Sequence, residues 1–188
     1  MIVLAPLVPA FGTSQEPGLG LVGRADLLHL PERAVVVTLR TVSLCRWPHV
    51  FGTNLRGVDN FATGRRLNVD RLAQADDFNF HEIDIRDREQ IDEVIDGVDY
   101  IFHQAAAPSV PRSVDDPVTT TNANCTGTAV VLDAARKADV DTTVVASSSS
   151  VYGSSQELPK VETMEENPES PYALTKDFTE KLALEFSS

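Results

Sequence analysis

The sequence predicts an α/β fold, a doubly wound parallel sheet whose strands are joined by helices. Short apolar runs alternate with segments of helical periodicity from residue 34 to residue 186. This order is typical of parallel strands connected by crossover helices. The 188 residues are 42% hydrophobic, which is enough for one domain with a substantial core.

Each element is assigned from its place in this alternation. The apolar runs predict strands at residues 34–38, 55–59, 78–84, 100–104 and 142–148. The intervening patterns predict helices at residues 65–75, 88–95, 118–138 and 171–186, the last with Pro171 in its first turn. Residues 1–33 hold several Pro and Gly residues and show no period. We therefore expect an N-terminal extension of uncertain order there, followed by a domain at residues 34–188.

The last predicted strand and helix carry the chemically most informative residues. A run of serines, Ser147 to Ser150, closes the strand, and a Tyr-x-x-x-Lys motif places Tyr172 and Lys176 in the helix. Residues four apart lie on one face of a helix, so the phenol and the ammonium are neighbours. A positive charge beside a phenol favours the phenolate, which can remove a proton. The motif alone recurs by chance, and the serine run is what makes it informative.

Upstream of these residues, four further blocks follow in a fixed order. They are residues 58–64 (VDNFATG), 81–87 (HEIDIRD), 98–107 (VDYIFHQAAA) and 122–128 (NANCTGT). Together with the serine and Tyr-x-x-x-Lys segments, they resemble the extended short-chain dehydrogenase/reductase family, specifically its NAD-dependent epimerases and dehydratases. Residues 104–113 and 155–176 look most like UDP-N-acetylglucosamine and UDP-glucose 4-epimerases. The resemblance implies a Rossmann-like fold, incomplete at the C-terminus, with NAD as cofactor.

The resemblance also implies where NAD binds, at the carboxyl ends of the strands. From adenosine to nicotinamide, the implied residues are Asp59, Asn60, Phe61, Thr63, Gly64, Asp84, Ile85, Ala105, Ala106, Asn124, Tyr172 and Lys176. The carboxylate after the second strand would accept hydrogen bonds from the ribose and repel a 2′-phosphate, although Arg65 and Arg66 leave NADP open. His103 is expected to be structural, because no metal or triad partners accompany it.

A UDP-sugar 4-epimerase is the activity that the resemblance implies. Tyr172 would remove a proton from the sugar hydroxyl while C4 gives a hydride to NAD, and Lys176 would hold the nicotinamide ribose. Ser148 would hydrogen-bond the reacting oxygen, with Ser147 and Ser149 as alternatives.

Two further inferences concern the substrate. Ser109 and Arg112 are candidates for contacting the sugar or its diphosphate. A dehydratase or reductase is the alternative reaction, but the family's dehydratases carry an acidic pair where this chain has Ser149 and Ser150. An epimerase is therefore favoured, and the sugar itself cannot be read from the sequence.

The chain departs from the family pattern after its first predicted strand. The family has a glycine-rich turn there that holds the pyrophosphate, whereas residues 39–52 (LRTVSLCRWPHVFG) lack its glycines. The Gly-x-Gly-x-x-Gly at residues 18–23 precedes the strand and is interpreted as a decoy. A shifted reading frame before Gly57 is one hypothesis, and the family's substrate domain is expected to be absent after Ser188. We therefore expect weak or absent NAD binding and little turnover, with a non-catalytic remnant as the alternative.

Composition narrows the remaining possibilities. A net charge of −12 argues against a nucleic-acid surface, which needs a basic face. Two distant cysteines, Cys45 and Cys125, suggest neither a disulfide framework nor a metal site and favour a cytoplasmic protein. The apolar residues 1–10 are too short and too proline-broken to cross a membrane, and no targeting signal is expected. The family often dimerises through the Tyr-x-x-x-Lys helix and the helix before it, so a homodimer is expected.

Overall fold

The computed structural model describes residues 2–6, 33–37, 54–74 and 76–187 of the chain. In chain order the elements are β1 (Ile2–Pro6), β2 (Arg33–Val37), β3 (Asn54–Val58), α2 (Arg66–Leu72), β4 (Phe78–His81), α3 (Arg88–Ile95), β5 (Tyr100–His103), α4 (Val110–Asp115), α5 (Pro117–Thr121), the π-helical turn η2 (Asn122–Thr126), α6 (Gly127–Lys137), β6 (Thr142–Ala146), the 3₁₀ turn η3 (Ser149–Tyr152) and α7 (Pro171–Phe186).

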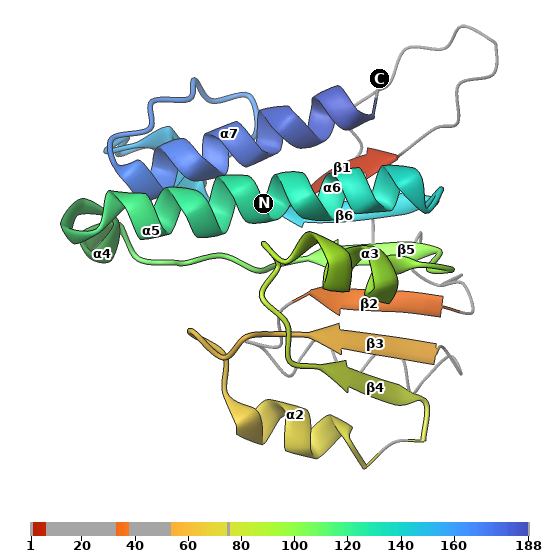
Figure 1. Cartoon of the computed structure of the whole chain (residues 1–188). Coiled ribbons are helices and arrows are strands. Elements are labelled where there is room, and N and C mark those ends of the chain that lie inside the picture. Colours follow the sequence, from red (N-terminus) through yellow and green to blue (C-terminus); the bar gives the residue numbers. More distant parts are fainter. Residues whose placement is uncertain (1, 7–32, 38–53, 75, 188) are drawn as a thin grey trace, which may run out of the picture.

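The strands form one sheet in the order β1-β6-β5-β2-β3-β4 (Figure 1). All neighbours are parallel except β1, which runs antiparallel to β6 at the edge. The parallel core with its crossover helices confirms the predicted α/β, Rossmann-like class. Because the chain crosses from β4 back over β2 to β5, the sheet has a switch point between β2 and β5, and loops at the carboxyl ends diverge there.

The expectation that residues 1–33 lie outside the fold is wrong for Ile2–Pro6. This apolar run pairs with Thr142–Ala146 along the whole of β6 and so covers an edge whose backbone groups would otherwise lack partners. Pro6 ends the strand, consistent with the confinement of proline to the ends and edges of sheets. Residues 1–33 as a whole show no period, and for this reason the short strand at their start was not predicted.

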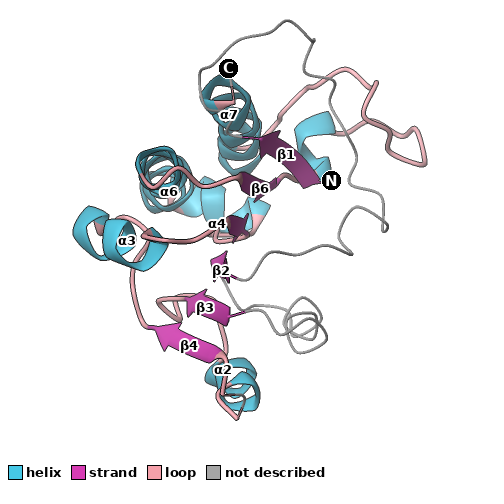
Figure 2. Ribbon diagram, turned by 90° about the vertical axis from the view of Figure 1, so that its right-hand side faces the viewer, coloured by secondary structure: helices cyan, strands magenta, loops and turns pink. Residues whose placement is uncertain are grey.

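Helices cover both faces of the sheet, with α3 and α6 on one side and α2 on the other (Figure 2). On the first face, Ile91 of α3 and Val131 of α6 are fully buried with Ile101 of β5. On the second, Val69 of α2 packs near Leu55 of β3. Burying side chains of this size contributes about 1.5–3 kcal/mol each, so these contacts fix the helices on the sheet.

The helices between residues 110 and 138 differ from the prediction. The expected helix at 118–138 is divided into α5, the π-helical turn η2 and α6, and α4 precedes it. The division follows from local hydrogen bonds: the Asp116 side chain accepts from the Thr119 N–H and so starts α5, with Pro117 in its first turn.

The strands predicted at 78–84 and 142–148 end earlier, at His81 and Ala146, which leaves Asp84 and Ser148 in loops.

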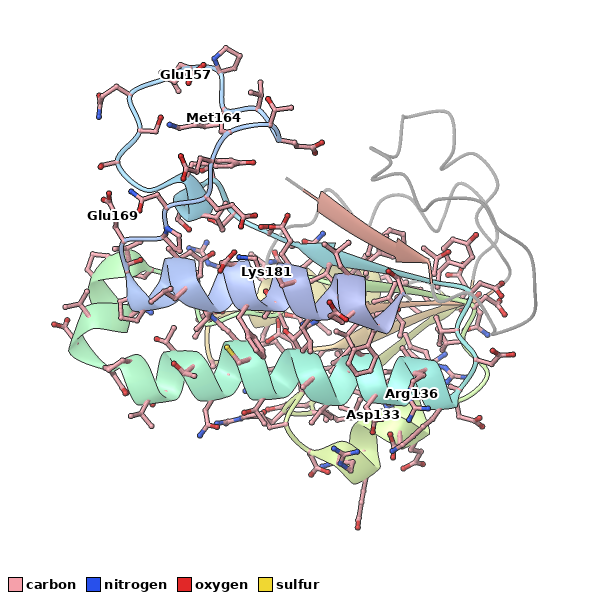
Figure 3. The ribbon with its side chains drawn as sticks, turned by 90° about the horizontal axis from the view of Figure 1, so that it is seen from above. Asp133, Arg136, Glu157, Met164, Glu169 and Lys181 are labelled. Carbon is pink, nitrogen blue, oxygen red and sulfur yellow. The ribbon has the colours of Figure 1, made fainter. Side chains whose placement is uncertain are left out.

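Helix α7 lies beside α6 and carries a long return loop, residues 153–170, at its N-terminal end (Figure 3). Ala183 of α7 packs against Leu132 of α6 and Val145 of β6. Lys181 of α7 pairs with Glu166 of the loop at 3.0 Å and with Asp177 one turn back. These contacts attach the loop to the helix that bears the Tyr-x-x-x-Lys motif. Within the described part of the chain, no helix has the length and apolarity needed to cross a membrane.

Candidate active site

The first part of the site is the turn after β3. The Asp59 carboxylate is 7% exposed, and its Oδ1 accepts a hydrogen bond of 2.7 Å from the Phe61 N–H. Phe61 itself has a φ of 56°, a left-handed conformation that non-glycine residues rarely adopt outside functional turns. A Cβ on Gly64 would lie 2.3 Å from Asp59 Oδ2, so a larger residue there would displace the carboxylate from its present position.

The turn after β4 lies beside it. Arg86 donates to Asp84 through Nε at 2.8 Å and through Nη2 at 2.6 Å, and Asn60 Nδ2 donates to the same carboxylate at 3.0 Å. These hydrogen bonds, the Arg86 side chain first among them, hold the pKa of Asp84 well below its ordinary value. The carboxylate is therefore ionised at neutral pH and joins the two strand-end turns.

Ile85 anchors this second turn to the helix layer. Its side chain is buried, and a Cβ on Gly127 at the start of α6 would lie 2.3 Å from Ile85 Cδ1. A glycine at that position therefore lets α6 approach the strand ends. His103 of β5 is also buried here, and its Nε2 lies 2.8 Å from Thr128 Oγ1 of α6. Burial, assisted by Lys176, lowers the pKa of His103 to about 3, so its ring is neutral at physiological pH.

These turns enclose a cleft of ≈ 120 Å³. Its walls include seven of the residues assigned to NAD from the sequence, namely Asp59, Asn60, Thr63, Asp84, Ile85, Ala105 and Ala106. A second, more open groove of ≈ 670 Å³ adjoins it through Ala62 and Thr63. Phe61 and Gly64 line this groove, together with both substrate candidates, Ser109 and Arg112.

Asn124 joins the strand-end loops to α7. It lies in the π-helical turn η2 and is 1% exposed. Its Oδ1 accepts from the Ala107 N–H at 2.7 Å, while its Nδ2 donates to Thr175 Oγ1 at 2.8 Å. One side chain therefore fixes both the loop after β5 and the middle of the Tyr-x-x-x-Lys motif. Turns of this helix type recur at functional sites, and the sequence did not reveal this one.

Two serines set the position of Tyr172. Ser170 caps α7 by accepting from the Ala173 N–H at 3.1 Å, as the Ser-Pro start of the helix suggests. Ser113 of α4, which is fully buried, accepts from the Tyr172 N–H at 3.0 Å and donates to Val110 O at 2.7 Å. Sequence reasoning missed Ser113, because its partner lies 59 residues away. A weak signal was its place in the segment 104–113 that supported the family resemblance.

Lys176 is buried on the same helix, with 5% of its surface exposed. Burial lowers the pKa of Lys176 to about 8, against smaller opposing effects of Cys125 and Glu180. A buried ammonium of this kind is costly to the fold and is typical of sites that use the charge.

The serine run separates into three environments. Ser147 donates to Glu180 Oε2 at 2.7 Å, and Ser149 is exposed. Ser148 is half-buried and accepts from the N–H and the hydroxyl of Ser150, at 3.2 and 2.9 Å. The Ser147 hydroxyl proton is thus already donated to Glu180, whereas Ser148 only accepts and keeps its proton for a ligand, which favours Ser148 among the alternatives. Helix α7 packs against the turn η3 that these serines begin.

The structure thus brings seven of the cofactor candidates into one cleft at the strand ends. Asn124 is bonded to the helix that carries Tyr172 and Lys176. Neither Tyr172 nor Lys176 lines the cleft or the adjoining groove. The predicted departure from the glycine-rich turn, at residues 39–52, and the Gly-x-Gly-x-x-Gly at residues 18–23 lie outside the described residues.

Comparison with known proteins places this geometry in context. A family model described as the NAD-dependent epimerase/dehydratase family matches residues 50–188. A putative UDP-glucose 4-epimerase of Methanocaldococcus jannaschii is 40% identical over 122 residues, which cover 63% of this chain and 38% of that protein. A dTDP-glucose 4,6-dehydratase of Streptomyces niveus is 33% identical over 73% of this chain and 41% of its own length.

Solved structures show the same pattern. The UDP-glucose 4-epimerase of Stenotrophomonas maltophila, with bound NAD and formylated UDP-arabinopyranose, is 26% identical and superposes with a TM-score of 0.75. The match covers 82% of this chain and 48% of that one. The chain therefore spans about two fifths of the length of the curated relatives it matches and about half of the solved structures.

The buried ammonium gives a stability prediction. Because the pKa of Lys176 is about 8 in the folded chain and 10.5 ordinarily, its charge destabilises the fold fully below pH 8. This cost disappears as the pH rises toward 10.5. We predict that the unmodified chain gains about 3 kcal/mol of unfolding free energy as the pH rises from 7 through 8 toward 10.5, relative to Lys176→Met, which lacks this titration. Urea denaturation across this pH range measures the difference between the two chains, with Lys160→Met in the surface loop as control. A difference between the two chains that does not change with pH would contradict the prediction.

Proposed function

Because the chain belongs to the NAD-dependent epimerase/dehydratase family, we propose that it carries the cofactor and proton-transfer site of a nucleotide-sugar 4-epimerase. The observation that carries the proposal is the placement of Tyr172 and Lys176. They lie one turn apart on α7, whose start is held by Ser113 and whose middle is held by Asn124. This arrangement supports a fixed phenol beside a buried ammonium at the serine-bearing end of β6.

The residues present fit NAD at its adenosine end. The buried Asp59 carboxylate, over which Gly64 closes, suits the ribose hydroxyls, and the cleft beside Ile85 suits the adenine. The Arg66 side chain is engaged by Glu82 at 2.9 Å and lies 4.3 Å from the centre of the Phe61 ring. A cation that is already paired and a buried carboxylate both favour NAD over NADP.

Pyrophosphate binding is the weaker part of the proposal. The family's glycine-rich turn has no counterpart in the sequence of residues 39–52. We therefore propose that NAD is held mainly at its two riboses and binds less tightly than in relatives with that turn. Arg65 and Arg112, which line the larger groove, suit the diphosphate of a UDP-sugar.

Each side chain then has a defined part in the reaction. Bound NAD would supply reversible hydride acceptance at the sugar C4, and an epimerisation would leave it unchanged overall. Tyr172 removes the proton from the C4 hydroxyl and later gives it back. Lys176 favours the phenolate by its charge and binds the nicotinamide ribose, and the Ser148 hydroxyl donates a hydrogen bond to the reacting oxygen.

A dehydratase is the second candidate, since the Streptomyces niveus relative has that activity by name. Ser149 and Ser150 stand where family dehydratases carry their acidic pair, and Ser150 already bonds to Ser148. A dehydratase needs an acid and a base there to remove water, so the serines favour the epimerase.

We also propose that the protein is located in the cytoplasm, since the free thiol of Cys125 accords with a reducing compartment.

A homodimer through α5 and α7 belongs to the same proposal. These two helices pack together, and they expose large apolar side chains, Val118 at 71%, Leu174 at 54% and Phe178 at 46%. Grouped apolar residues on the surface are typical of interaction sites.

Loss of activity in Tyr172→Phe tests the reaction. We predict that the purified chain with NAD interconverts a UDP-sugar and its C4 epimer slowly, because its NAD binding is weakened, and that Tyr172→Phe lowers kcat by about a further 100-fold or more while NAD is still bound. Chromatography of the nucleotide sugars measures the product, and Tyr100→Phe on β5 is the matched control. Full activity of Tyr172→Phe would sink the proposed mechanism. NAD binding without any turnover by the unmodified chain would support the non-catalytic alternative.

A charge at the apolar surface tests the dimer. We predict a dimer in light scattering coupled to size-exclusion chromatography. Phe178→Glu is expected to weaken the association at least tenfold, because it puts a charge where the dimer would bury an aromatic side chain. Leu158→Glu, in the loop of residues 153–170 and 79% exposed, is the control and stays dimeric. A monomeric unmodified chain, or an unaffected Phe178→Glu variant, contradicts this interface.

A further inference from the structure

We propose that Glu180 is a positioning residue of the site: held by Ser147, its carboxylate is the buried counter-ion that keeps Lys176 charged. The inference rests on the proposed function for its meaning, but not for its test. Glu180 lies four residues after Lys176 on α7 and therefore on the same helix face. It is 8% exposed, next to a lysine that is 5% exposed.

The carboxylate is tied to the end of β6. Ser147 directly follows the strand, and its hydroxyl donates to Glu180 Oε2 at 2.7 Å. This bond joins the strand to the helix 33 residues later in the chain. It also fixes the backbone immediately before Ser148, the candidate substrate-contacting serine. The Glu180 carboxylate is therefore placed to influence both the strand end that carries Ser148 and the charge of Lys176 on α7.

The charges around the pair support a counter-ion role. Tyr152 of η3, Glu166 of the return loop, and Asp177 and Lys181 of α7 face Glu180, while His103 of β5 and Cys125 of η2 face Lys176. Burial first, then Glu166 and Asp177, raise the pKa of Glu180, against the Ser147 hydrogen bond and Lys181.

Burial lowers the pKa of Lys176 to about 8, and Cys125 first and then Glu180 act against it. Burial raises the pKa of the Cys125 thiol, so at neutral pH this group is uncharged, as is the His103 ring. Within the part of the chain that the structure describes, Glu180 is therefore the carboxylate that favours the charged form of Lys176. Because a buried ammonium without a counter-ion loses its proton readily, this carboxylate extends the pH range in which Lys176 stays charged.

A merely structural role for Glu180 makes a different prediction. Gln has nearly the same shape as Glu and its amide oxygen still accepts from the Ser147 hydroxyl. Glu180→Gln therefore removes the charge while the strand-to-helix bond is kept. If Glu180 served only to hold Ser147, this variant would leave the titration of Lys176 unchanged.

The test is an NMR titration of the whole chain with lysine labelled by ¹³C at Cε, without NAD or substrate. Lys176→Met identifies the Lys176 signal. We expect Glu180→Gln to lower the midpoint of its titration by roughly one pH unit, the size of effect expected for a unit charge one helical turn away at a partly buried site. Glu180→Asp restores most of the shift, and Glu185→Gln, exposed on the same helix, leaves the midpoint unchanged.

An unchanged midpoint in a folded Glu180→Gln variant overturns the inference. If that variant does not fold, Ser147→Ala decides, since it releases the carboxylate from its place and must also lower the midpoint. The outcome is independent of catalysis: a shifted midpoint in a chain without turnover retains the counter-ion role and rejects the proposed function, and turnover with an unshifted midpoint does the reverse.

Discussion

The hydrogen bonds of Asn124 are the constraint on which the site depends. A single buried amide joins the backbone of Ala107, after β5, to the Thr175 hydroxyl in α7. The π-helical turn at Asn122–Thr126 inserts this side chain between the two elements. Removing the amide would leave the half-buried Ala107 N–H without its partner, at about 1–3 kcal/mol, while the Thr175 hydroxyl would keep its hydrogen bond to Tyr172 O. The loop beside the strand-end cleft and the Tyr172–Lys176 helix therefore keep a fixed position relative to each other.

Around this connection, several residues have charges or backbone conformations that lower the stability of the fold. Lys176 is a buried ammonium, Phe61 and Ser109 have positive φ angles, and Asp59 is a buried carboxylate under a glycine. Each feature lies at the carboxyl end of the sheet or on α7. Of the three described non-glycine residues with a positive φ, only Asp139, between α6 and β6, lies elsewhere. Strained backbone and buried charge at the same end of a sheet are typical of a binding site.

Local signals explain what the sequence could predict. Helix α7 was predicted with its observed bounds because Ser170 and Pro171 provide a cap and a first turn that depend on neighbours only. The cofactor residues at the strand ends were placed through the family resemblance and meet in one cleft. The strand Ile2–Pro6, the turn η2 and the Ser113–Tyr172 hydrogen bond were missed, because each depends on partners far along the chain. Helical periodicity also cannot distinguish an α-helix from one with a single π turn.

If the strand-end cleft is an NAD site, as we propose, Asp59 receives the hydroxyls of the adenosine ribose. Titration calorimetry of NAD⁺ into the chain, continued to millimolar concentration, measures this binding. We expect saturable binding that Asp59→Ala weakens by about tenfold or more, the effect of losing hydrogen bonds to a charged acceptor. Asp70→Ala, on the exposed face of α2, is expected to leave the affinity unchanged. No saturable binding, or equal affinity in Asp59→Ala, would rule out this site.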